Sequence, residues 1–232
     1  MNNPQLPLGL ALRDSARFAS YYPGGNQEAV SSLQAAAAGR GETFVFLAAA
    51  GGLGKTHLLQ AACHRASECR RMAVYVPLRD ITNFSPAVLD GLEQMELVCL
   101  DDIDVLAGQM EGEQALFHLY NRTRESGGVL LVAASVRAHL CGFILPDLVS
   151  RLGWGLTYKL QPLDDGSVFA ALLHRAQSRG LELPEDTASF LLKRIPRDLP
   201  SVFDSLDRLD EAAMIEQRRL TIPFVKAVLG LV

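Results

Sequence analysis

The sequence predicts an α/β fold with a parallel sheet, followed by a small C-terminal domain made only of helices. Apolar runs of strand length alternate with helical patterns up to about residue 160, an alternation typical of parallel sheets. After Pro162 the apolar residues recur at three- and four-residue spacings. With 232 residues, 49% of them apolar, the chain is long enough to bury a sizeable core. We expect a flexible lead over 1–17, an α/β core over 18–162 and a helical lid over 163–232.

The expected core begins with a helix over 27–38, which ends at Gly39. Strands are then expected at 43–49, 72–76, 97–101, 129–134 and 157–160. Helices are expected between them at 55–69, 85–95 and 111–125, which implies parallel strands joined by right-handed crossovers. The lid is expected to hold helices at 164–179, 184–194, 198–216 and 222–229, with Asp164 as an N-cap.

A glycine-rich turn joins the strand at 43–49 to the helix at 55–69 and ends in Gly54-Lys55-Thr56. This layout is typical of a phosphate-binding loop, because glycines let backbone N–H groups surround phosphate oxygens at a helix N-terminus. Lys55 would reach the β- and γ-phosphates, and the Thr56 hydroxyl would hold Mg²⁺. The expected nucleotide contacts are Gly52, Leu53, Gly54, Lys55, Thr56 and His57.

This loop departs from the full pattern at one position, and a simpler interpretation exists. The pattern has a glycine where this chain has Ala49, and alanine would strain the loop if a positive φ were needed there. The alternative is a glycine-rich loop that only links a strand to a helix.

A second nucleotide signature is the apolar run 97–100, which is followed by Asp101 and Asp102. Carboxylates at the C-terminal end of a buried parallel strand lie at the sheet edge where ligands bind. Asp101 would hold Mg²⁺ through water, and Asp102 would orient or deprotonate the attacking water. Taken alone, the pattern also fits a strand that ends in solvated aspartates.

Composition limits the remaining function classes. The formal net charge is −4, so we expect DNA contact to be weak or indirect. No run of 18 apolar residues and no signal-peptide pattern is present, which argues against a membrane partner. The four cysteines lack metal-ligand spacing, and reduced thiols favour a cytoplasmic location.

Several strings carry a family resemblance. GLGKTHLLQA at 52–61 and SRLGWGLT at 150–157 resemble AAA+ ATPases of the DnaA-like branch. LPDLVSRL at 145–152, QRRLTIPFVK at 217–226 and QLPLGL at 5–10 resemble the DnaA regulatory-inactivator family (Hda). The resemblance covers nearly the whole chain and implies an AAA+ phosphate-loop core with a helical lid. It also implies that the DNA-binding domain of DnaA is absent.

The resemblance assigns the arginine-finger role to Arg151. Such a guanidinium stabilises charge on a neighbour's γ-phosphate, and the resemblance implies that Arg151 acts in trans on ATP held by DnaA. Hydrolysis would convert the active initiator into its ADP form. On spacing alone, a surface arginine paired with Asp147, four positions earlier, is the favoured interpretation. The surrounding string SRLGWG reverses that preference.

The lead over 1–17 contains a candidate partner-binding peptide. Extended apolar residues can enter a hydrophobic pocket while an amide fixes the register. The resemblance implies that the pocket lies on the replicative sliding clamp (DNA polymerase III β subunit), and the contact residues would be Gln5, Leu6, Leu8 and Leu10. The alternative is a disordered tail, or an arm that packs on its own domain.

Aromatic residues precede the first helix. The resemblance suggests that Tyr21, Tyr22 and Pro23 lie near the adenine base, and they can equally be core residues.

Two positions depart from the family pattern and bear on hydrolysis by the chain itself. After the strand at 129–134, only Ser135 can sense the γ-phosphate. The lid arginine of the pattern aligns with Pro200, which has no charge and no donor, and Arg197 one turn earlier is a possible substitute. We therefore expect bound ADP (or ATP) with Mg²⁺ and at most weak ATPase activity.

The leading interpretation is a clamp-bound AAA+ protein that donates Arg151 to DnaA and so inhibits replication initiation, with self-association through the same edge possible. The first alternative is an autonomous ATPase of the helicase-loader type, for which Lys55, Thr56, Asp101 and Asp102 are intact. The second alternative is a scaffold that binds no nucleotide.

Overall fold

The computed structural model describes residues 12–82 and 84–231, and it contains one parallel sheet. The strand order across the sheet is β2-β3-β4-β1-β5, so the strand that leads into the glycine-rich loop lies between β4 and β5. The strands are β1 (Phe44–Ala48), β2 (Ala73–Pro77), β3 (Leu97–Asp101), β4 (Val129–Ala134) and β5 (Leu156–Lys159). The predicted α/β class with a parallel sheet is confirmed.

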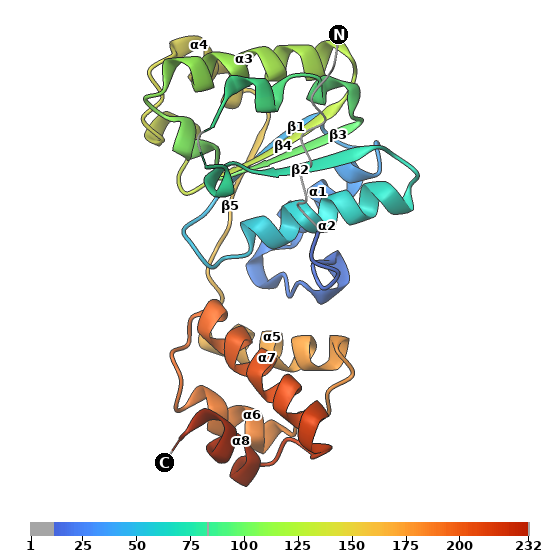
Figure 1. Ribbon diagram of the computed structural model, residues 1–232, viewed down its shortest axis with the longest axis vertical. Coiled ribbons are helices and arrows are strands. Elements are labelled where there is room, and N and C mark those ends of the chain that lie inside the picture. The colour runs from blue at the N-terminus through green and yellow to red at the C-terminus, as the bar shows by residue number, and fades with distance from the viewer. Residues whose placement is uncertain (1–11, 83, 232) are drawn as a thin grey trace.

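Helices cover both faces of this sheet (Figure 1). Along β1, Val45 and Leu47 pack on the face covered by α1 (Gln27–Ala37) and α2 (Lys55–Glu68). Phe44 and Phe46 pack on the opposite face, covered by α3 (Met110–Glu125) and α4 (Pro146–Leu152). Successive side chains of a strand point to opposite faces, so a continuous apolar run is what a strand buried on both sides requires.

The C-terminal helices form a separate bundle with its own apolar core. They are α5 (Asp165–Ser178), α6 (Glu185–Leu192), α7 (Leu199–Glu216) and α8 (Ile222–Leu229). Leu206 and Phe224 are buried at its centre. Asp164 caps α5, as predicted, by accepting a hydrogen bond of 2.7 Å from the Ser167 amide.

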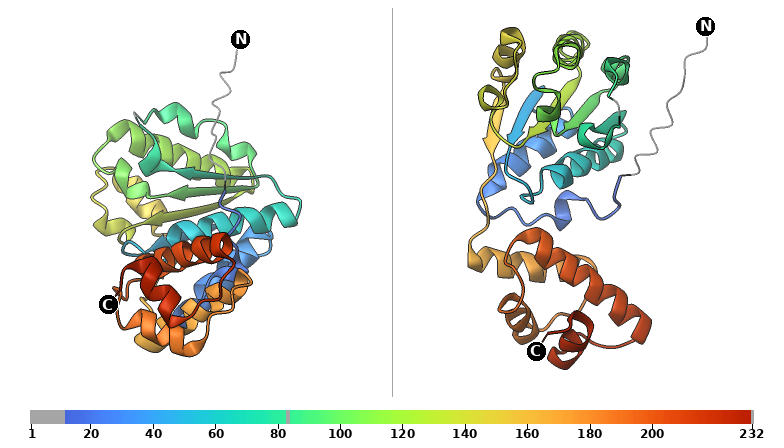
Figure 2. Two further views of the ribbon diagram at one scale, coloured as in Figure 1. Left: turned by 60° about the horizontal axis from the view of Figure 1, so that its bottom comes forward. Right: turned by 60° about the vertical axis from the view of Figure 1, so that its left-hand side comes forward.

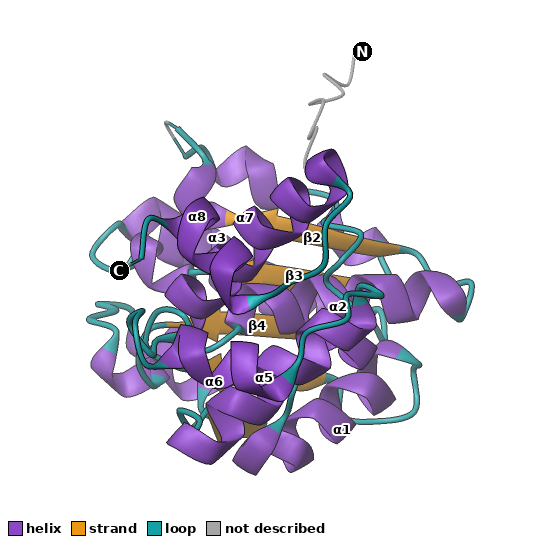
Figure 3. Ribbon diagram, turned by 90° about the horizontal axis from the view of Figure 1, so that it is seen from below, coloured by secondary structure: helices purple, strands orange, loops and turns teal. Residues whose placement is uncertain are grey.

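The bundle lies beyond α1 and α2, on the side of the core away from α3 and α4 (Figures 1 and 2). Seen from that side, the lid helices lie in front of the strands (Figure 3). Asn26 helps to fix the connection, because its amide group exchanges two hydrogen bonds with the Gln161 backbone, at 2.7 and 3.0 Å. The segment before α1 is thereby tied to the chain as it leaves the sheet.

One expectation about the elements is wrong, and one helix was not expected. Residues 85–95 are not a helix: they form short 3-10 turns over Pro86–Leu89 and Leu92–Gln94, separated by Gly91 at a φ of +79°. A left-handed residue interrupts an α-helix, so the apolar spacing there reflects packing and not helical periodicity. Helix α4 was not among the expected elements, since seven residues are too few to show a period. Within the described residues, no helix has the length and apolar character needed to cross a membrane.

Candidate functional site

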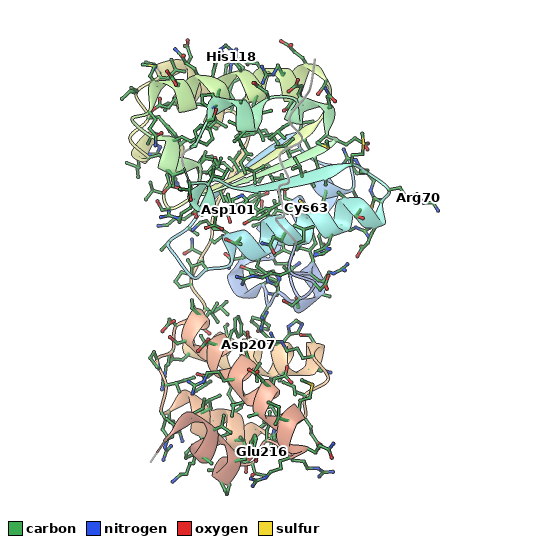
Figure 4. All side chains as sticks on the ribbon, viewed as in Figure 1. Cys63, Arg70, Asp101, His118, Asp207 and Glu216 are labelled. Atoms are coloured by element: carbon green, nitrogen blue, oxygen red, sulfur yellow. The ribbon has the colours of Figure 1, made fainter. Side chains whose placement is uncertain are left out.

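A cavity of about 720 Å³ lies where the glycine-rich loop, the segment before α1 and the lid come together. The loop supplies Gly51 to His57, and the segment before α1 supplies Tyr21 and Tyr22. Helices α5 and α7 supply the lid wall, which includes Arg175, Pro200 and Phe203. Figure 4 shows Asp101 on the core and Asp207 on the part of the lid nearest to it.

The loop has the conformation that phosphate binding requires. Gly52 and Gly54 have φ values of +80° and +89°, a left-handed region open mainly to glycine. Ala49 is not among the described residues with positive φ, and its amide extends the β1–β4 ladder by a 3.1 Å hydrogen bond to Ala134. Alanine is therefore tolerated at the one position where the loop departs from the pattern.

Lys55, at the start of α2, folds back over this loop. Its side chain is buried, and its Nζ donates to the carbonyls of Ala49 and Ala50 at 2.6 and 3.3 Å. These bonds hold a positive charge beside the loop amides, where an incoming phosphate would meet it.

Thr56 and Asp101 are brought together from residues 45 positions apart. The Thr56 hydroxyl donates to Asp101 Oδ2 at 2.5 Å, and the Tyr75 hydroxyl donates to the same oxygen at 3.0 Å. Burial raises the pKa of Asp101 above its usual value, and the hydrogen bond from Thr56 partly offsets that effect.

The Thr56–Asp101 pair fits a magnesium site. Mg²⁺ prefers oxygen ligands and typically takes one or two from protein, the rest from water and nucleotide phosphates. A hydroxyl and a carboxylate 2.5 Å apart beside the loop supply those two oxygens. Across the described part of the chain, no group of three His, Cys, Asp or Glu side chains is placed to hold a metal by itself.

Asp102 is at the cavity, but it has a strong partner. Its φ is +54°, and Arg79 Nε donates to its Oδ2 at 2.8 Å. Ser135, the polar residue after β4, also lines the cavity, and both its hydroxyl and its amide donate to Asp104.

The segment before α1 packs directly on the loop. A Cβ placed on Gly54 would lie 2.7 Å from the Tyr21 ring, and the Tyr21 hydroxyl donates to the Leu53 carbonyl at 3.3 Å. Burial raises the pKa of Tyr21 to about 12. Tyr22 instead meets His174 of α5, with ring centroids 6.1 Å apart. Both tyrosines line the cavity, and Pro23 is not part of its lining in the described chain.

His57, a predicted nucleotide contact, lies between these groups. Its ring is 5.6 Å from that of Tyr21, and its Nε2 donates to the Arg17 carbonyl at 2.9 Å. Burial lowers the pKa of His57, which favours a neutral imidazole.

The lid presents an apolar residue where the pattern expects a cation. A Cβ on Gly52 would lie 2.8 Å from Pro200 Cγ, so the proline ring packs against the loop. Arg197 forms an ion pair with Asp165 and is not among the described residues that line the cavity. Arg175 does line it, with its guanidinium 4.7 Å from the centre of the Phe203 ring.

Arg151 lies at the opposite end of the sheet from the loop. At the end of α4, its guanidinium stacks 4.4 Å from the centre of the Trp154 ring, and Trp154 is 57% exposed. A Cβ on the next residue, Gly155, would lie 2.6 Å from the Phe44 carbonyl, at the start of β1. Among the described residues, no ion pair joins Arg151 to Asp147.

The predicted clamp contacts Gln5, Leu6, Leu8 and Leu10 lie outside the described residues. Sequence reasoning missed Tyr75, Arg79, Glu113 and Arg175. Tyr75 lies within β2 and Arg79 follows that strand, and β2 pairs with β3, which ends in Asp101. Strand pairing alone could have suggested both residues. For Glu113 and Arg175 there was no signal, because their partners come from distant segments.

Two family models cover most of the chain. The model described as the bacterial DnaA ATPase domain matches residues 12–159, and that described as the Hda lid domain matches residues 164–229. Together they account for both the sheet with its cavity wall and the helical bundle.

Solved structures agree on the fold. Domain III of the Thermotoga maritima replication initiation protein DnaA matches with a TM-score of 0.79 and 22% identity, over 95% of this chain and 98% of that one. AMPPCP-bound DnaA from Aquifex aeolicus matches with a TM-score of 0.71 and 20% identity, over 86% of this chain and 66% of that one. The Thermotoga maritima RuvB Holliday junction branch migration motor matches with a TM-score of 0.65 and 19% identity, over 93% of this chain and 73% of that one. The chain belongs to the bacterial DnaA ATPase-domain family of AAA+ proteins, and its C-terminal domain is a lid of the Hda type.

Proposed function

We propose that the cavity binds an adenine nucleotide with Mg²⁺. The left-handed Gly52 and Gly54, the buried Lys55 and the Thr56–Asp101 pair support this proposal. So does the likeness to a DnaA solved with AMPPCP. Lys55 would bind the phosphate oxygens, and Mg²⁺ would neutralise charge between the β- and γ-phosphates.

We further propose that the protein regulates replication initiation by supplying Arg151 to ATP held by DnaA. The observation that carries this proposal is the position of Arg151 beside the start of β1, whereas the phosphate-binding loop follows its end. A five-residue strand spans about 16 Å, so the guanidinium is out of reach of this chain's own loop. A finger so placed acts on a nucleotide held by another protomer.

In that complex Arg151 would stabilise the charge that develops on the γ-phosphate, as arginine fingers do. Its contact with Trp154 leaves all five N–H donors for phosphate oxygens, because a ring face takes none of them. The product is ADP-bound DnaA, the form unable to initiate. The sliding clamp, bound through Gln5, Leu6, Leu8 and Leu10, would hold the protein at the replisome.

The chain's own nucleotide would turn over slowly. Asp102 is paired with Arg79, and Pro200 places no charge beside the loop. Both features reduce the stabilisation of charge on the γ-phosphate, and they reduce the affinity for a diphosphate less. We therefore propose ADP as the resident ligand. Self-association through the Arg151 edge would hide the finger from DnaA.

The test is ATP hydrolysis by ATP-loaded DnaA with clamp loaded on DNA, in the presence of this protein. Unaltered protein should accelerate hydrolysis, and Arg151→Ala should lose the acceleration by about 10³-fold or more. Arg40→Ala, an exposed arginine on another part of the core, is the control for loss of charge. Equal acceleration by Arg151→Ala would overturn the proposal. A Gln5→Ala, Leu6→Ala double variant should lose clamp binding and retain nucleotide binding.

A second function, an autonomous ATPase of the helicase-loader type, is favoured by the assembled Thr56–Asp101 pair. It predicts ordinary turnover of ATP by the isolated chain and binding of single-stranded DNA. Turnover measured without DnaA separates the two functions.

A further inference from the structure

The lid wall of the cavity contains one cation whose partner is missing from the described residues. Arg175 of α5 forms no ion pair with any of them, and its Nε is buried without a hydrogen-bond acceptor. Buried guanidinium donors almost always have acceptors, and an unpaired one is costly. A ligand in the cavity would supply the acceptor that this donor lacks.

The protein's own carboxylates near Arg175 are otherwise engaged or exposed. Asp207 accepts from Arg179 Nη1 at 2.6 Å, and Arg179 also meets Asp210 at 3.4 Å. Asp204 also lines the cavity and is exposed to solvent, with no ion pair to Arg175 among the described residues. Burial lowers the pKa of Arg175, the like charge of Arg179 lowers it further, and the charge of Asp207 offsets part of this effect. An anion in the cavity would further stabilise the charged guanidinium.

The position of Arg175 places its guanidinium near the loop. It stacks on Phe203, and Phe203 is three residues after Pro200 on α7, so both lie on one face of that helix. Residues at this spacing have Cβ atoms about 5–6 Å apart. Pro200 packs against Gly52 of the loop. The guanidinium thus lies over the face of α7 that carries Pro200, and both residues line the same cavity as the loop.

The other cations at the cavity do not match this description. Arg79 is paired with Asp102, and Arg197 is paired with Asp165 away from the lining. Arg13 lines the cavity but is exposed, and α5 of the lid does not carry it. Only Arg175, of the described lining residues, combines a lid position, partial burial and an unpaired donor.

We propose that Arg175 is the lid cation of this protein: it binds the phosphate groups of the nucleotide and so couples the lid to the ligand. It takes over the role that Pro200 cannot perform, from a different helix. This inference rests on the proposed nucleotide site, and it makes Arg175 a binding residue for the diphosphate.

The test is calorimetric binding of ADP and of adenosine to the purified full chain. Arg175→Ala should weaken ADP binding by about tenfold or more, the effect of losing a charge-assisted hydrogen bond. Adenosine affinity should stay within about twofold, because adenosine has no phosphate. Arg175→Met, which keeps the aliphatic contact with Phe203, should reproduce both results and excludes a lid that simply loosens.

Arg208→Ala is the matched control, since it removes a charge from the lid outside the cavity lining, and its ADP affinity should be unchanged. Arg197→Ala tests the competing lid arginine. Normal ADP binding by both Arg175 variants would overturn the inference, and so would equal losses for ADP and adenosine. If the proposed nucleotide site is itself wrong, the result differs. Lys55→Ala would then bind ADP as tightly as the unaltered protein, or neither the variant nor the unaltered protein would bind ADP.

Discussion

Pro200 of the lid packs against Gly52 of the phosphate-binding loop, so closely that a Cβ on Gly52 would lie 2.8 Å from Pro200 Cγ. The contact joins the two parts of the chain at the point where the nucleotide would bind. An arginine here would bind phosphate through its charge, whereas a proline ring makes only apolar contact with the loop. The contact therefore packs the lid against the loop without an electrostatic interaction with the nucleotide.

Gly52→Ala should destabilise the protein by about 1–3 kcal/mol, because it forces a side chain into left-handed backbone as well as against a rigid ring. The measurement is chemical unfolding of the ligand-free chain. Gly51→Ala is the control, since Gly51 has open space around its Cβ position and no positive φ, and its stability should change by less than about 0.5 kcal/mol. Equal stability of the two variants would contradict the contact.

Glu113→Ala should destabilise the protein by about 3 kcal/mol or more. The carboxylate is fully buried on α3 and accepts from the amides of Gly108, Ile144 and Leu145 at 2.8, 2.9 and 2.7 Å. Losing this acceptor leaves three buried donors without a partner, and each unsatisfied donor costs about 1–3 kcal/mol.

Because residues 144 and 145 lead directly into α4, the change should also reduce acceleration of DnaA hydrolysis through Arg151. Glu111→Ala, exposed on the same helix, should cost less than about 1 kcal/mol. The prediction fails if thermal unfolding of the two variants is alike.

Asp101→Asn should abolish the Mg²⁺-dependent part of nucleotide binding. In the unaltered protein the Mg²⁺-dependent binding should weaken as the pH falls, because Asp101 becomes protonated. Burial raises the pKa of Asp101, so this loss should begin at a higher pH than it would for an exposed carboxyl. Nucleotide binding with and without Mg²⁺ across a pH series is the measurement. Asp147→Asn, at an exposed site, should behave like the unaltered protein.

The same pKa shift has a consequence for folding stability. A carboxyl whose pKa is higher in the folded than in the unfolded state favours the native state most at low pH, and that contribution is lost as the pH rises through the raised value. The ionised Asp101 thus costs free energy at neutral pH. Asp101→Asn should raise the thermal midpoint of the ligand-free chain at pH 7, and a lowered midpoint would contradict this.

Trp154→Ala should reduce the acceleration of DnaA hydrolysis by about tenfold while the free energy of unfolding changes by less than about 1 kcal/mol. The indole is 57% exposed, yet its face holds the Arg151 guanidinium at 4.4 Å, so its removal frees the finger without opening the core. Trp154→Phe should retain most of the effect. Leu140→Ala, at another exposed apolar residue, is the control. Unchanged acceleration by Trp154→Ala would show that the ring does not position Arg151.

Much of the core follows from local patterns along the chain. Apolar runs predicted β1 to β4, because a strand buried on both faces leaves few polar positions. The fifth strand, β5, is a mostly exposed edge strand that carries Thr157 and Lys159, and it was expected as the strand that completes the sheet. The pattern failed at 85–95, where apolar spacing suggested a helix and Gly91 adopts a left-handed φ that ends it. It also failed at α4, whose seven residues are ordered by packing and by Glu113.

Chemistry carried by neighbouring residues was determined by the sequence itself: Gly54-Lys55-Thr56 at a helix start and Asp101-Asp102 at a strand end. Only the tertiary structure decided the partners of these groups. Two contacts join segments distant in the sequence: the ion pair of Arg79 with Asp102 and the packing of Pro200 on Gly52. The unpaired Nε of Arg175 belongs to a side chain that lines the cavity between such segments. Backbone periodicity is set by near neighbours, whereas the partner of a side chain depends on which distant surface packing brings against it.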